Sequence, residues 1–175
     1  MYPYNFNPKQ TETAKTTQNP TTLNIHSKEV KDACKVPPKP DKKLLDMIQM
    51  GITDSAQTAS FYKTLMNVLR IPNDIEMVRN TYLDELKHVK LLQEIYYIAS
   101  GEKAPEYTVT PVSLSENILE NFQKAIFDSL EAADFYRELY FSFLNLELRD
   151  MLFEILTDEQ DHAARFNFLF SKYKQ

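Results

Sequence analysis

Glycine, cysteine and tryptophan are scarce in this sequence of 175 residues, which has two glycines, one cysteine and no tryptophan. Tight hairpin turns between strands often need glycine, so the scarcity disfavours a sheet protein with many turns. The chain after residue 43 is rich in Leu, Glu and Lys, which are good helix formers. The composition therefore predicts an all-α domain with few, long helices.

Cys34 is the single cysteine, so no internal disulfide can form. There is also no Cys-x-x-Cys pair to build a rubredoxin-type iron site or a zinc ribbon. The sequence contains no apolar run long enough to span a bilayer, and its N-terminus lacks the apolar core of a signal peptide. We therefore expect a cytoplasmic protein in a reduced setting, with no membrane span.

Charge and proline divide the chain into two parts. Residues 1–43 carry eight lysines and four acidic residues, whereas residues 44–175 carry 12 basic and 21 acidic residues. An acidic body without a basic stripe argues against nucleic acid as a partner. Residues 1–40 hold six of the nine prolines and little apolar content, which predicts a disordered or loosely ordered tail. Residues 41–175 form the expected folded domain.

The pattern Asp-Glu-x-x-His occurs at residues 84–88 and again at residues 158–162. A shift of 74 residues aligns the two copies, and in the same register it gives ten identities over the 39 positions from Asp54 to Leu92. A helical hairpin used twice explains this repeat. We therefore predict a four-helix bundle built from two repeated hairpins joined by a crossover.

Capping signals and apolar periodicity set the expected helix limits. Asp41 is the expected N-cap of a first helix that ends near Arg70, and Gly101 is the expected C-cap of the second. Two capping boxes, Asn73 with Glu76 and Ser113 with Glu116, are expected to begin the second and third helices. Residues 101–112 form the expected crossover between the two hairpins. The third helix is expected over about 114–143, and a turn near Asn145 leads to the fourth.

Glu85 and Glu159 lie at the centres of the apolar stripes of their helices. An ionised carboxylate there costs several kcal/mol unless it is paired, protonated or bound to metal. His88 and His162 lie one turn further along the same faces, where a neutral imidazole can complete a metal site. These four residues are the predicted metal ligands. The alternative is a polar layer held by Glu–His hydrogen bonds and water.

Asp84 and Asp158 precede the two glutamates on an adjoining face. From there each carboxylate can accept the free N–H of a ligand histidine across the bundle, which would fix the tautomer of the imidazole. We predict this supporting role for both aspartates.

The order of helices and motifs resembles the ferritin-like superfamily, and most closely the rubrerythrin-type di-iron carboxylate proteins. The phrases Ala-Ser-Phe-Tyr and Ala-Asp-Phe-Tyr and the run TDEQDHAARFNFLF are similar to small ferritin-like proteins of endospore-forming bacteria. The resemblance covers residues 41–175 and lacks the rubredoxin domain. It implies a site of four carboxylates and two histidines, with a Glu seven residues before an inward Tyr on the first and third helices.

Tyr62 and Tyr136 are the matching tyrosines, and the positions seven residues earlier are Ser55 and Ser129. Both halves have therefore lost the same ligand. Asp54 and Asp128 are candidate substitutes, although they sit about 100° round the helix from the serines and have short side chains. Tyr62 and Tyr136 are the expected redox or hydrogen-bonding groups beside the site.

Two carboxylates balance one divalent ion, so Glu85 and Glu159 favour a single Fe, Mn or Zn ion, or no metal, over a di-iron pair. We expect no haem, flavin or rubredoxin-type iron.

Two functions remain open. One is a metal-dependent protein with redox or peroxide-related activity. The other is a structural or interaction protein without chemistry, associated with a spore layer or the forespore, with the tail binding a partner. A homodimer fits either function.

Overall fold

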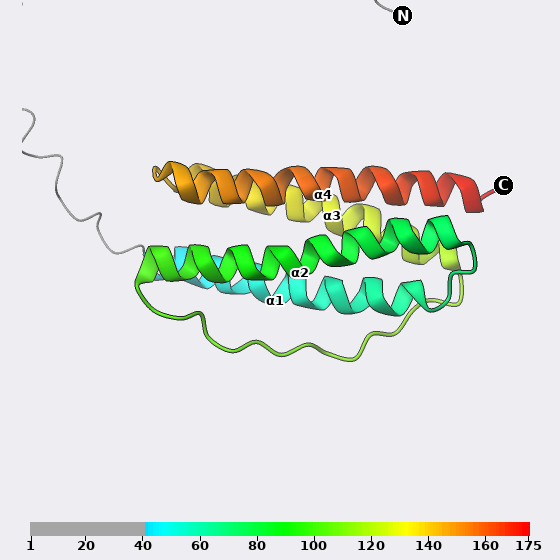
Figure 1. The fold of residues 1–175 in the computed structure, drawn as a ribbon, viewed down its shortest axis with the longest axis horizontal. Coiled ribbons are helices and arrows are strands. Elements are labelled where there is room, and N and C mark those ends of the chain that lie inside the picture. Colours follow the sequence, from blue (N-terminus) through cyan, green and yellow to red (C-terminus); the bar gives the residue numbers. More distant parts are fainter. Residues whose placement is uncertain (1–40) are drawn as a thin grey trace, which may run out of the picture. The chain divides into compact units, whose positions relative to one another are not determined.

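The computed structural model describes residues 41–175, and the predicted tail, with Cys34, lies outside this range. The described part contains four helices: α1 over Lys42–Met66, α2 over Pro72–Ser100, α3 over Ile118–Ser142 and α4 over Leu146–Tyr173. They form a four-helix bundle in which α1 pairs with α2 and α3 with α4 (Figure 1). The predicted all-α bundle of two hairpins is confirmed. None of these helices is long and apolar enough to cross a membrane.

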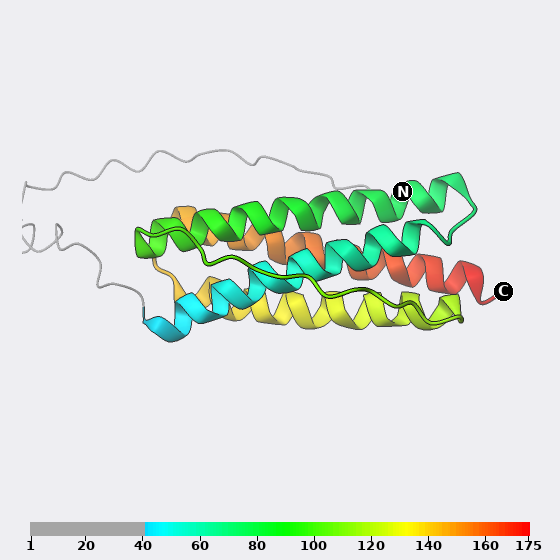
Figure 2. The same ribbon diagram turned by 90° about the horizontal axis from the view of Figure 1, so that it is seen from below.

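The crossover between the hairpins, residues 101–117, runs back along the bundle beside α1 (Figure 2). Two side chains of α1 bind it. Gln49 Nε2 donates to the carbonyl of Pro105 at 3.2 Å, and Gln57 Oε1 accepts from the backbone N–H of Thr110 at 2.8 Å. Because the crossover spans the length of the bundle, α3 starts at the end opposite to the end of α2. This connection brings α2 and α4 together as well as α1 and α3.

Two predicted helix ends are found in the structure. The side chain of Asp41 accepts from Lys43 N, and Gly101 ends α2 with a φ of 77°. The predicted end of the first helix near Arg70 is wrong, because α1 ends at Met66. The backbone N–H of Asn67 bonds to the carbonyls of Leu65 and Thr64, which tightens the last turn and closes the helix early.

The two predicted capping boxes are also wrong. The second helix begins at Pro72 itself, since proline fits the first helical position, where the missing N–H needs no partner. The third begins at Ile118, with the side chain of Asn117 accepting from Leu119 N. Asparagine caps a helix as well as serine does, so both positions were acceptable N-caps.

The bundle core consists of two apolar clusters, one toward each end. The first cluster includes Ile48, Leu92, Leu139 and Leu152, all fully buried. The second cluster contains four buried rings, those of Phe61, Tyr62, Phe122 and Phe166. Several of the other buried side chains are polar and come from all four helices: Ser55, Glu85, His88, Ser129, Glu159 and His162.

Asp74 joins the start of α2 to the end of α4 through hydrogen bonds to its side chain. Its buried carboxylate accepts from Lys172 Nζ at 2.7 and 2.9 Å and from the Tyr173 hydroxyl at 2.9 Å, which ties the start of α2 to the end of α4. Lys172→Ala should lower the free energy of unfolding by about 2 kcal/mol, because it leaves a buried carboxylate with one fewer charged donor. Chemical denaturation measures this loss. The control Lys90→Ala removes an exposed charge of α2 and should change stability by less than about 0.5 kcal/mol; equal effects would contradict the prediction.

Candidate metal centre

The four predicted ligands come from two antiparallel helices that face each other at mid-bundle. Glu85 and His88 lie on α2, and Glu159 and His162 lie on α4. A spacing of three residues puts each Glu and its His on one helix face. All four side chains are buried, and both histidines have no exposed surface. The structure therefore brings together the four residues that the sequence pattern singled out.

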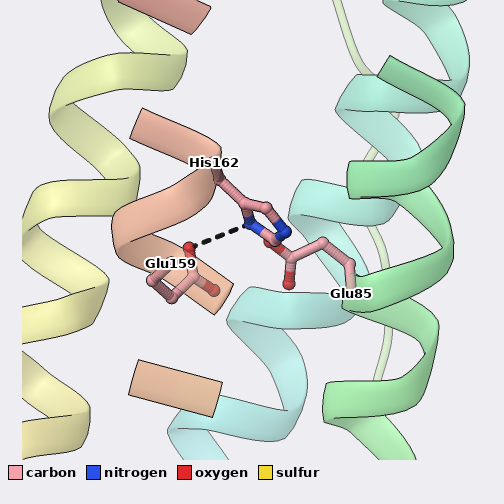
Figure 3. Close-up of side chains that lie close together, drawn as sticks. All are labelled: Glu85, Glu159 and His162. Carbon is pink, nitrogen blue, oxygen red and sulfur yellow. Dashed lines mark ion pairs between the residues drawn. The ribbon is translucent and has the colours of Figure 1, made fainter. Parts of the chain in front are cut away.

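Each histidine lies close to both carboxylates. His88 Nδ1 is 3.5 Å from Glu85 Oε2 and 3.4 Å from Glu159 Oε1. His162 Nδ1 is 3.4 Å from Glu159 Oε2 and 3.7 Å from Glu85 Oε1. Figure 3 shows Glu85 reaching from α2 toward Glu159 and His162 on α4. The arrangement has approximate two-fold symmetry, as the repeat in the sequence predicts.

These donor atoms fit a metal ion. One ligand atom from each of Glu85, Glu159 and His162 lies within 4.8 Å of the others. His88 is not in this group, but its Nδ1 lies 3.4 Å from Glu159 Oε1. Three atoms here are buried without a hydrogen-bond partner in the described part of the chain: Glu85 Oε2, His88 Nδ1 and His162 Nδ1. Buried polar atoms rarely go unsatisfied. Two imidazole nitrogens, once they have released their protons, and a carboxylate oxygen form a donor set that Fe, Mn and Zn accept.

The two aspartates lie behind the histidines, across the bundle. His88 Nε2 is 3.2 Å from Asp158 Oδ2, and His162 Nε2 is 3.3 Å from Asp84 Oδ2. An acceptor at Nε2 keeps a proton on that nitrogen and leaves Nδ1 as the nitrogen that faces the carboxylates. The cross-bundle contacts expected from the sequence are therefore present. Their supporting role toward a metal ion stays a prediction.

The carboxylates strongly favour protonated histidines at this centre. Burial lowers the pKa of each imidazole, but neighbouring acidic groups outweigh this effect. Asp158 and the two glutamates raise the pKa of His88 to about 11. Asp84 and the same glutamates raise the pKa of His162 to about 9. Without a bound metal ion, two imidazolium groups therefore lie beside Glu85 and Glu159.

The pKa values of the two central glutamates shift in different directions. Burial and the negative charge of Glu159 raise the pKa of Glu85. Burial also raises the pKa of Glu159, but the two histidines beside it outweigh burial and lower the pKa overall. The centre is therefore a coupled set of charges in which a proton or a cation must accompany each carboxylate.

Two cationic side chains cover the α2–α4 side of the centre, and sequence reasoning missed both. Lys87 Nζ is 2.6 Å from Asp158 Oδ2 and 3.1 Å from Glu154 Oε1. Arg165 pairs with Asp161 and lies 3.6 Å from Asp84. The only sequence signal was the spacing of Lys87 from Asp84 and of Arg165 from Asp161, which is common on any helix.

The two serines bind the tyrosines of the opposite hairpin. Ser55 Oγ is 3.0 Å from the Tyr136 hydroxyl, and Ser129 Oγ is 3.3 Å from the Tyr62 hydroxyl. All four residues are buried. Burial, followed by the charges of the nearby glutamates, raises the pKa of both tyrosines well above the ordinary value, so both stay protonated. The serines therefore fill polar positions without adding any negative charge.

The two candidate substitutes, Asp54 and Asp128, do not join the group of donor atoms that lie within 4.8 Å of one another. Both line a small cavity that also reaches Glu85 and Glu159. Asp128 Oδ2 pairs instead with Lys124 Nζ at 2.6 Å on the surface. The aspartates thus lie on the α1–α3 side of the centre, outside the predicted ligand set.

No family model and no curated protein matches this sequence. Among solved structures, the chain is similar to a hypothetical protein from Pyrococcus furiosus, with a TM-score of 0.64 and 21% sequence identity. The match covers 73% of this chain and 88% of that chain. A likeness at this identity concerns the fold alone. What this bundle does must therefore be argued from its own buried centre, where a Glu, Glu and His group could hold a metal ion.

Proposed function

We propose that this protein is a ferritin-like, rubrerythrin-like metal protein that holds one Fe, Mn or Zn ion between α2 and α4. Glu85, Glu159 and His162 would supply ligand atoms that already lie close together, and His88 would complete the set. One observation carries the proposal. Both fully buried histidines have an Nδ1 without a hydrogen-bond partner among residues 41–175, and both of these atoms face the central carboxylates.

Charge supports one divalent ion over two. The described centre offers two carboxylates that no Lys or Arg contacts, Glu85 and Glu159, and these balance one divalent cation. The positions where the resemblance expects two further glutamates carry Ser55 and Ser129, which are neutral and already bonded to tyrosines. A second divalent ion would add two positive charges to a buried site without counter-charge, which is unfavourable at low dielectric.

Redox or peroxide-related activity would depend on the metal. A bound iron or manganese ion supplies one-electron chemistry, whereas zinc has no redox chemistry. The chain would hold the ion away from bulk water and keep the ligand histidines oriented through Asp84 and Asp158. The Tyr62 ring packs edge-on against His162, with the ring centroids 6.3 Å apart, and is a hydrogen-bonding or redox group next to the ligands.

Metal analysis tests the proposal directly. The full chain, purified from cells supplied with iron, manganese and zinc, should carry one transition metal ion per chain. After metal removal, it should take up one equivalent of Fe²⁺, Mn²⁺ or Zn²⁺ under anaerobic conditions and unfold at a higher temperature when loaded. Two ions per chain would contradict the single-ion site, and no uptake of any of the three would refute the metal function.

A structural or interaction role, such as one in a spore layer, is the second candidate. It is favoured by the Ser–Tyr pairs, which satisfy the polar groups of α1 and α3 without a metal ion. Peroxide consumption separates the two roles. Iron-loaded protein should consume peroxide and zinc-loaded protein should not; equal inactivity of the iron-loaded protein supports the structural role.

A further inference from the structure

The α1–α3 side of the bundle contains a cavity directly beside the metal centre. This inner cavity, of about 30 Å³, has walls that include Ser55 on α1 and Ser129 on α3, and it reaches Glu85 and Glu159. A buried water molecule needs about 10–15 Å³ of such volume, so the space suits one or two waters. The short side chains of the two serines leave room that a longer side chain would fill.

An outer hollow of about 350 Å³ continues this cavity toward solvent. The hollow and the inner cavity share five lining residues: Asp54, Thr58, Asp128, Ala132 and Tyr136. Together they make a route from the surface, between α1 and α3, to the two central glutamates. Glu85 is 2% exposed at its side chain, and no group in the described part of the chain makes a hydrogen bond to its Oε2. An unpaired carboxylate oxygen therefore lies at the inner end of the route.

The charges on the two sides of the centre favour approach by a cation from the α1–α3 side. Asp54, Asp128 and Glu131 line the hollow there, with Lys124 as its cation. Lys87 and Arg165 cover the α2–α4 side instead, where they pair with acidic groups behind the histidines. Three carboxylates against one lysine give the hollow a net negative lining, which concentrates cations and speeds their association.

We propose that Asp54 and Asp128 capture a hydrated divalent cation at the mouth of this route and pass it inward to Glu85 and Glu159. The proposal rests on the metal function argued above. The two aspartates occupy equivalent positions in the two repeats, one on each helix that borders the route. They act as positioning residues for loading, separate from the ligands of the final site.

The rate of metal loading tests this assignment. Co²⁺ is mixed with the metal-free full chain in a stopped-flow instrument, and the visible absorption of Co²⁺ reports its arrival at the His and carboxylate ligands. The double variant Asp54→Asn with Asp128→Asn should load at least about 10-fold more slowly at low ionic strength. Its final spectrum and its stoichiometry should match those of the wild type. Added salt should lower the loading rate of the wild type more steeply than that of the double variant.

The matched control is Asp46→Asn with Glu138→Gln, which removes the same charge from exposed positions of α1 and α3 away from the hollow. This control should load at nearly the wild-type rate. A second variant, Ala132→Leu, narrows the route without changing charge and should also slow loading.

Three outcomes separate the two proposals. Equal loading rates in the aspartate variant and its control would overturn the capture site while leaving the metal function intact. A changed final Co²⁺ spectrum in the aspartate variant would also overturn it, because the aspartates would then be ligands of the central ion. Failure of the wild type to bind Co²⁺, Fe²⁺, Mn²⁺ or Zn²⁺ would instead refute the metal function.

Discussion

Replacing His88 and His162 together with alanine should lower the affinity of the protein for Zn²⁺ by roughly 10⁴-fold. Structural zinc sites with four ligands bind with about 10–16 kcal/mol near pH 7, or about 3 kcal/mol for each ligand. Both histidines lie within 3.4 Å of a central carboxylate oxygen and present a free Nδ1 to it. Competition with a chelator of known affinity measures the loss.

Folding must be checked in the same experiment, because alanine leaves two buried carboxylates without their imidazolium partners. The variant His88→Gln with His162→Gln keeps polar side chains of similar length, and circular dichroism reports whether the helices remain. The graded control is Asp84→Asn with Asp158→Asn, which keeps the four ligands, removes the charge of the acceptors behind the histidines and should lower the affinity by about 10–100-fold. A folded glutamine variant with wild-type affinity would show that the histidines are not ligands.

Metal affinity should rise by about 100-fold when the pH is raised by one unit from neutral. Without metal, the carboxylates hold the pKa of His88 at about 11 and that of His162 at about 9, so both imidazoles carry a proton. A ligand histidine must be neutral, so binding releases two protons, and each contributes about tenfold per pH unit. The exchange of two protons for one divalent ion leaves the charge of the centre unchanged. Zn²⁺ titrations in buffers of several pH values test this slope.

The stability of the metal-free protein should change in the opposite direction. Both histidines have folded-state pKa values above their ordinary value of 6.5. Their contribution to stability is therefore complete below about pH 6.5 and is lost as the pH rises through about 9 and then about 11. Urea denaturation of the metal-free chain should give a lower free energy of unfolding at alkaline than at neutral pH. A flat metal affinity together with a flat stability would mean that the two histidines are neutral already.

Local physical chemistry explains why most of the fold could be predicted. Low glycine content, apolar periodicity and a repeat of 74 residues point to two helical hairpins, and the structure has them. The helix ends were less predictable. Pro72 could end one helix or start another, and Ser113 and Asn117 were both acceptable N-caps, because several local signals of similar strength compete within a few residues.

The sequence by itself determined the membership of the centre. Glu85 and Glu159 interrupt apolar stripes, and a buried carboxylate must be paired, protonated or bound to metal. Each glutamate is followed three residues later by a histidine, and this spacing places both side chains on the same helix face. The same periodicity indicated that Ser55 and Ser129 face inward from α1 and α3, which the structure confirms.

Only the tertiary structure decided how these side chains meet. It pairs each serine with the tyrosine of the other hairpin, gives each histidine both carboxylates, and places Lys87 and Arg165 on one side of the centre. On the other side it places a small cavity, lined in part by Asp54 and Asp128, beside the two glutamates. These contacts join residues about 70 or more positions apart, and their distances depend on how the two hairpins pack. A periodicity within one helix carries no information about that packing.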